Sequence, residues 1–332
     1  MTVTNKIDVL NILLLFVSLF LALLLPFELF LFSYAVLGPL HYLTEINWLH
    51  KKNYFVKDKK YIWMLLAFTV AITFVSLFRY LKLDSTFSYF INYYSRVLLN
   101  VLIVSSLFFS IGLVFFKDYK KIIVALILAV LGGLIFLKFI PFSFVLVGVF
   151  LPTLIHVYLF TMLFMALGTI KNRSNYGIIA IVILAVVPVF IFYNPFFSSY
   201  EISQSVKSTF LETRFKNVIV SINQIVNDSS FLDFDFNSVI IIKIQTFIAF
   251  AYTYHYLNWF SKTSLIGWNK NLSRNYIVLI FALWFASIAL YLYSYRVGVL
   301  ALFFLSMFHV IVEFPLNIIS IKEVFFKRKS FD

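Results

Sequence analysis

Residues 27–48 read FELFLFSYAVLGPLHYLTEINW, an apolar run long enough to cross a lipid bilayer as one helix. Within it lie His41 and Glu45, whose i, i+4 spacing places both side chains on one helix face. An ionisable side chain at bilayer depth costs roughly 2.5–3.5 kcal/mol on insertion scales. We therefore expect this pair to face the protein interior and to have a function.

The composition extends this interpretation to the whole chain. Its 332 residues are 62% hydrophobic, 20% aromatic and only 12% charged, whereas soluble domains are about 25% charged. We expect one integral membrane domain over residues 1–332, of the all-α class, built as a bundle of roughly ten (8 to 10) membrane-spanning helices. The expected spans are residues 9–25, 27–48, 61–79, 97–116, 122–137, 142–170, 176–193, 238–260, 276–294 and 298–320.

Two of these spans are open to a second interpretation. Only the turn at Pro26 separates the first span from the second, so residues 9–48 could instead form one long kinked helix. The fifth span is short and contains Gly132 and Gly133. No small-residue cleavage site follows the first apolar run, so we expect it to be retained rather than removed as a signal peptide.

The net charge of +13 comes from short basic clusters between the apolar runs. Such clusters favour the cytoplasmic side of a membrane and contact anionic lipids, and they do not indicate nucleic-acid binding. They recur on alternate loops, which predicts that both termini are cytoplasmic. Residues 194–237 are then expected on the opposite side as a loop or interfacial helix. The expected partners are membrane lipids and a lipophilic small molecule, and protein partners are unknown.

Four of the five histidines fall within expected spans, and the chain contains no cysteine. Without thiolates, a metal must bind through nitrogen and oxygen, and imidazole is the commonest nitrogen ligand. The candidate metal ligands are His41, His156, His255 and His309. His50 lies in a loop beside Lys51 and is expected to be a solvated residue.

Three further groups of residues accompany these histidines. Glu313 follows His309 at the same i, i+4 spacing as Glu45 follows His41, so each glutamate is expected either to support a histidine by a hydrogen bond or to bind the metal directly. Asn258 is a further supporting candidate. The rings of Tyr254, Tyr256 and Trp259 can line a substrate channel or belong to the interfacial aromatic belt. Taken singly, a histidine in a membrane helix is more often a packing or hydrogen-bonding residue.

In chain order, these residues resemble the motifs of the Brp/Blh family of bacterial membrane β-carotene dioxygenases. Its members carry Gly-x-x-His-x-x-x-Asp, a middle histidine motif, His-x-x-x-His-Phe and His-x-x-x-Asp-Phe. The matching residues here are Gly38, His41 and Glu45; His156; His255 and Phe260; and His309, Glu313 and Phe314. Glutamate replaces both aspartates, and Trp259 stands at the position of the second histidine in the third motif.

The resemblance implies a non-haem iron dioxygenase, an oxidoreductase of the bacterial inner (plasma) membrane. In this hypothesis the four histidines hold Fe(II), and O₂ meets a lipophilic, carotenoid-like substrate at the metal. Three alternatives remain open from the residues themselves. The metal can be another divalent ion, histidine pairs can be axial ligands of haem b in an electron-transfer protein, or the two His/Glu pairs can form the proton or cation path of a transporter.

Overall fold

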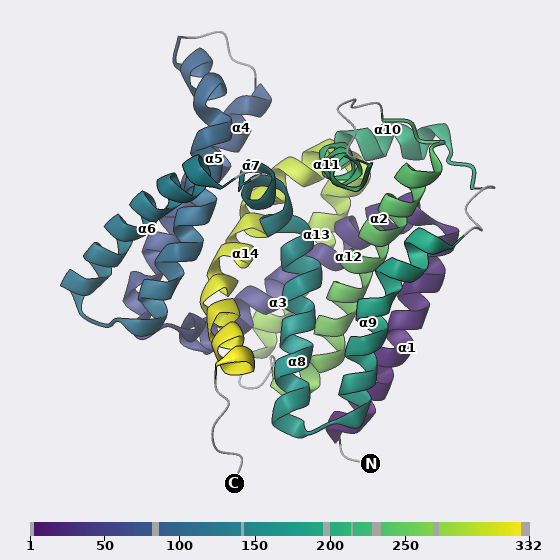
Figure 1. The fold of residues 1–332 in the computed structure, drawn as a ribbon, viewed down its shortest axis with the longest axis horizontal. Coiled ribbons are helices and arrows are strands. Elements are labelled where there is room, and N and C mark those ends of the chain that lie inside the picture. Colours follow the sequence, from purple (N-terminus) through teal and green to yellow (C-terminus); the bar gives the residue numbers. More distant parts are fainter. Residues whose placement is uncertain are drawn as a thin grey trace. The chain divides into compact units, whose positions relative to one another are not determined.

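The computed structural model describes residues 3–81, 86–140, 143–194, 200–213, 215–227, 234–267 and 272–326 (Figure 1). Throughout these ranges the regular structure is helical, and they contain no strand, which confirms the all-α class. The main helices are α1 (Val3–Leu24), α2 (Pro26–Phe32), α3 (Gly38–Lys51), α4 (Ile62–Leu81), α5 (Thr86–Phe115), α6 (Tyr119–Phe139), α7 (Ser143–Val145), α8 (Thr161–Asn172), α9 (Asn175–Tyr193), α10 (Gln204–Glu212), α11 (Lys216–Asn227), α12 (Val239–Ile266), α13 (Arg274–Tyr293) and α14 (Tyr295–Phe325). Two π-helical segments, η1 (Ser33–Leu37) and η4 (Leu146–Phe160), and two short 3₁₀ turns, η2 (Asn53–Phe55) and η3 (Lys59–Tyr61), complete them.

Nine helical segments in the described ranges are long and apolar enough to cross a membrane. The chain is thus an integral membrane protein with nine candidate spans, within the expected 8 to 10. The remaining expected span, residues 238–260, is present as helix α12 but is not among the nine. Polar side chains such as Lys243, Gln245 and His255 lower its mean hydropathy. The orientation in the membrane stays a prediction.

The boundary between the first two expected spans is a true break. Leu25 has a non-helical backbone (φ −137°, ψ 60°), and Pro26 is the first residue of α2. Proline fits this position because the first residue of a helix needs no amide hydrogen for the helical ladder. Helices α1 and α2 are therefore separate, and the alternative of one long helix is not found.

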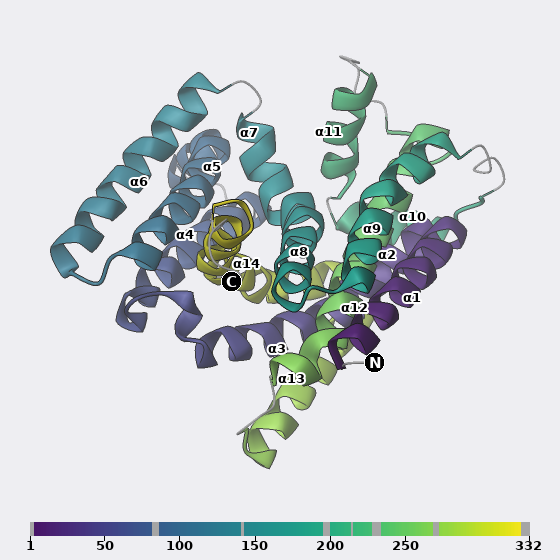
Figure 2. The ribbon, with the colours of Figure 1, turned by 60° about the horizontal axis from the view of Figure 1, so that its bottom comes forward.

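The described helices group into two compact units. The first comprises Met1–Leu43 and Val157–Ala301, and the second comprises Thr44–His156 and Leu302–Asp332. In the first unit α12 is central, since it packs against α1, α2, α9, α11 and η1 (Figures 1 and 2). Its residues Ile244, Ile248 and Phe250 are fully buried. The expectation of a single membrane domain stays a prediction.

The segment expected as a loop or interfacial helix contains two short helices, α10 and α11, which contact α2 and α12 respectively. Residues 195–199, 214 and 228–233 of this segment lie outside the described ranges. The side of the membrane on which the segment lies stays a prediction.

In the second unit, α5 packs along both α4 and α6 (Figure 1). Glycine permits the close approach of α6: a Cβ atom on Gly133 would lie 2.8 Å from Ser105 Oγ and 2.9 Å from Val104 Cγ1. A Cβ atom on Gly112 of α5 would likewise lie 2.5 Å from Ala125 Cβ. Small residues at such contacts are typical of membrane helices, whose association depends on close van der Waals packing. The glycine pair in the fifth expected span is therefore a packing feature of α6, which extends over 21 residues.

We expect Gly133→Leu to destabilise the second unit by about 1–3 kcal/mol, because the added side chain must displace α5. Thermal unfolding of the purified protein in detergent measures the change. Gly168→Leu in α8 is the matched control, since a Cβ atom there meets no atom within 4 Å. Equal losses in the two variants would contradict the close α5–α6 contact.

Candidate metal centre

His156 and His309 lie edge to edge in the protein interior. Their Nε2 atoms are 3.1 Å apart, and their side chains are only 2% and 6% exposed. Two nitrogens bound to one metal at about 2.1 Å and at right angles to each other are about 3 Å apart. The observed separation therefore suits two ligands of a single ion.

Glu313 lies beside the other ring nitrogen of His156. Its Oε2 atom is 3.1 Å from Nδ1 of His156, and both side chains are buried. A carboxyl group next to the ring nitrogen that faces away from the metal is typical of histidine ligands.

This contact corrects one sequence-based expectation. The i, i+4 spacing predicts that Glu313 supports His309 of its own helix, but the measured contact is with His156 of η4. Glu45 lies within electrostatic range of both His156 and Glu313 and is 3% exposed, so two carboxyl groups are buried close together.

His41 and His255 form a second pair of the same kind. Their Nε2 atoms are also 3.1 Å apart, and their ring planes are inclined by 68°. The side chains are 1% and 7% exposed. Residues 214 positions apart in the sequence thus direct the same ring nitrogen at each other.

Thr161 sets the tautomer of His255. Its Oγ1 atom lies 2.9 Å from the Val157 carbonyl oxygen and 2.7 Å from His255 Nδ1. The carbonyl can only accept, so the single hydroxyl proton goes to Val157 and the hydroxyl oxygen accepts from Nδ1 of His255. The lone pair of His255 therefore lies on Nε2, directed at His41. The His41–His255 pair therefore contains one ring held in the tautomer that binds metals through Nε2.

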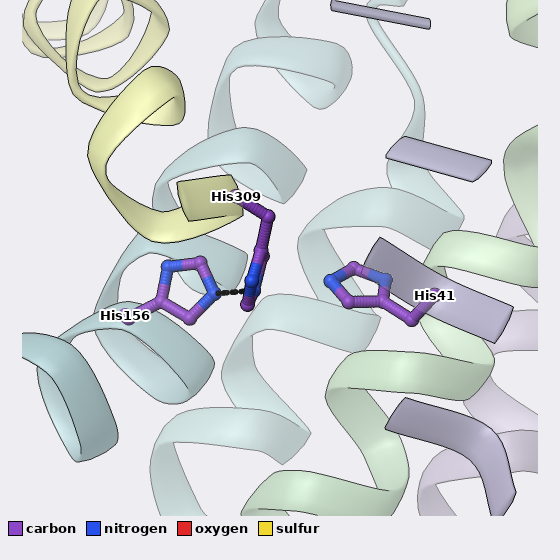
Figure 3. Close-up of side chains that lie close together, drawn as sticks. All are labelled: His41, His156 and His309. Carbon is purple, nitrogen blue, oxygen red and sulfur yellow. Dashed lines mark hydrogen bonds between the residues drawn. The ribbon is translucent and has the colours of Figure 1, made fainter. Parts of the chain in front are cut away.

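The four candidate histidines thus occur as two buried pairs, each within one unit. In the second unit, Figure 3 shows the rings of His156 and His309 joined through their ring nitrogens. In the first unit, His41 faces His255 in the same way. We call the four histidines of these pairs the cluster; their convergence on one ion stays a prediction.

The helices that carry the cluster are irregular close to the histidines. Pro39 lies two residues before His41, and Pro152 lies four residues before His156 inside the π-helical segment η4. Proline removes the amide hydrogen that a regular helix would donate. Widened π-helical turns are rare and occur frequently at functional sites.

The other predicted site residues divide between two faces of α12. Tyr256 and Trp259 flank His41, with ring centroids at 5.2 Å and 5.6 Å. Tyr254 instead donates its hydroxyl proton toward Met165 Sδ at 3.2 Å.

Asn258 belongs to a separate polar network on the Tyr254 face of α12. It donates to Asn11 Oδ1 at 2.8 Å and to the Tyr254 hydroxyl at 3.1 Å, and it accepts from Lys262 at 2.8 Å. Its expected support of a ligand stays a prediction.

The expectation that His50 lies in a loop is wrong, because His50 lies in the last turn of α3. It is exposed, as expected, and its Nδ1 atom lies 3.3 Å from the Tyr54 hydroxyl. Thr161 was not anticipated from the sequence. No motif distinguishes it from other threonines in apolar helices, because its role depends on a contact across 94 positions.

Comparison with models of protein families, with curated proteins and with solved structures finds no match to this chain. The interpretation of the site therefore depends on its residues and their geometry.

Proposed function

We propose that this protein is an integral membrane non-haem iron oxygenase that acts on a lipophilic, carotenoid-like substrate. The observation that carries the proposal is the pairing of buried ring nitrogens at 3.1 Å within each unit, between His156 and His309 and between His41 and His255. The tautomer set by Thr161 supports it, because it directs the lone pair of His255 rather than an N–H group toward His41.

Charge balance favours a divalent ion. Glu45 and Glu313 are buried beside histidines that are neutral when they bind metals. A divalent cation bound here would favour the ionised form of both carboxyl groups, and two carboxylates balance its charge. A donor set of imidazole and carboxylate without sulfur suits ferrous iron.

The same geometry disfavours haem. Two axial histidines of a haem stand on opposite faces of the macrocycle, with their nitrogens about 4 Å apart. The rings of each pair here are in direct contact at 3.1 Å, which leaves no space for a porphyrin between them. The pairs fit adjacent positions on one ion better than opposed axial positions.

A ferrous ion held by these residues would supply the activation of O₂. The protein would hold the ion, orient its ligands and exclude water from the buried cluster. Tyr256 and Trp259 offer ring faces and edges beside His41, which suits an apolar conjugated substrate. The position of the cluster in apolar helices, together with the motif resemblance to the Brp/Blh family, supports a lipophilic polyene as the substrate class.

We expect the freshly purified protein to contain iron, or another divalent transition metal, near one ion per chain. His156→Ala and His309→Ala each remove a proposed metal ligand. Each should therefore weaken metal binding by more than the roughly 10–100-fold that is typical for loss of a hydrogen bond to a ligand. Elemental analysis and competition with a chelator measure the effect. His50→Ala is the control and should retain the metal. A metal-free wild type that also fails to bind added iron would exclude the proposal.

Thr161→Val should lower the metal affinity by about 10–100-fold without loss of the fold, because His255 loses the acceptor that fixes its tautomer. Thr246→Val in α12 is a close control: Thr246 is buried and donates to the carbonyl four residues earlier, as Thr161 does. Titration of the metal-free protein with Fe(II) under anaerobic conditions compares the two. Equal affinities would show that His255 takes no part in the site.

With β-carotene as the probe in detergent, we expect the iron-loaded protein to consume O₂ as the polyene absorbance falls. His156→Ala should abolish both signals, and His50→Ala should leave them unchanged. If the iron-loaded wild type left β-carotene intact but mediated ion flux in liposomes that Glu45→Gln abolished, the transporter alternative would replace this proposal.

A further inference from the structure

The direction of His41 depends on the π-helical segment η1, which joins α2 to α3. The amide of Gly38 donates to the carbonyl of Ser33, five residues earlier, rather than to the residue four earlier. Relative to a regular α-helix, one such insertion rotates all later side chains by about 100°. If η1 became α-helical, His41 would turn away from His255.

Pro39 favours the widened turn. It has no amide hydrogen, so the carbonyl of Ala35 cannot receive the usual bond from four residues later. A π-helical turn also weakens the hydrogen bonds to nearby carbonyl oxygens. A buried carbonyl oxygen without a hydrogen-bond donor lowers stability by about 1–3 kcal/mol. The segment therefore needs donors from outside its own helix.

Side chains distant in sequence provide these donors. Trp284 Nε1 of α13 donates to the Val36 carbonyl at 2.7 Å, inside η1. The Tyr295 hydroxyl donates to the Leu31 carbonyl at 3.1 Å, just before the segment. The latter bond secures the end of α2, whereas the Trp284 bond acts on the π-helical turn itself.

The exposure of the other large side chains of α13 indicates a structural role for Trp284. Most large apolar side chains of this helix face outward, and Val278 and Phe285 are 59% and 61% exposed. In the first unit α13 packs chiefly against η1. Trp284 is therefore the polar link from an otherwise peripheral helix to the segment that orients His41.

We propose that Trp284 is a positioning residue for His41: its indole N–H holds η1 in the π-helical form and thereby directs Nε2 of His41 at His255. The orientation of the ring follows from the contacts within the first unit alone. Only its effect on metal affinity rests on the proposed function.

The direct test is ¹⁵N NMR of the histidine rings in the full-length, metal-free protein in detergent. His41→Ala and His255→Ala assign the signals of the pair. Wild type should show the ring-nitrogen shifts of an Nε2-to-Nε2 hydrogen bond, and Trp284→Phe, which keeps an aromatic ring but removes the donor, should lose them. Trp63→Phe is the matched control, because Trp63 is 59% exposed on α4. Helical circular dichroism should be the same in all three proteins.

Pro39→Ala tests the same inference without changing Trp284. It restores an amide donor and favours the α-helical form, so it should shift the ring signals in the same direction. The inference would be overturned if the ring-nitrogen shifts of His41 and His255 were unchanged in folded Trp284→Phe. If Trp284→Phe does not fold, unchanged shifts in Pro39→Ala would overturn it.

Cobalt(II) provides the second readout. Trp284→Phe should weaken Co(II) binding by about 10–100-fold and alter its visible spectrum, whereas Trp63→Phe should do neither. If the wild type binds no metal, the proposed function is excluded. The ring-nitrogen shifts would still test the role of Trp284. A metal-binding wild type whose ring shifts and cobalt spectrum were both insensitive to Trp284→Phe would retain the proposed function and exclude the positioning role.

Discussion

The burial of facing imidazole nitrogens is the constraint on which the rest of the site depends. Two Nε2 atoms at 3.1 Å, as in His156 and His309, repel each other if both present lone pairs, unless a proton or a cation lies between them. In apolar helices there is little water to relieve that repulsion. In the His41–His255 pair, Thr161 accepts the Nδ1 proton of His255, so the lone pair of His255 lies on Nε2 and a proton or a cation must join the two rings.

The class of fold and the identity of the histidines could be predicted from the sequence, because both depend on local properties. Apolar runs of about 20 residues form helices in a bilayer wherever they occur, and an ionisable residue within one is costly whatever its neighbours are. The same reasoning placed His50 outside the site. It overestimated the apolar character of α12, whose polar residues are buried against other helices rather than exposed to lipid.

The partners of the histidines could not be predicted, because they depend on tertiary contacts. Spacing within a helix paired Glu313 with His309, yet its carboxylate meets His156. Thr161 and Trp284 carry no local signal, since each acts across a long sequence separation. Gly38-Pro39 did contain a signal for η1, because a proline within a helix must disturb the hydrogen-bond ladder, but the form of the disturbance depends on which donors other helices supply.

Apolar packing of long helices supplies most of the interior of each unit, and the histidine cluster is a small part of it. A small zinc domain, by contrast, obtains its folding free energy from the ion itself. Here the rings are aligned by the helices, so the entropy of ordering them is lost on folding and not on binding. The centre is in this sense preorganised, and a chelator should empty it while leaving the helical scaffold intact.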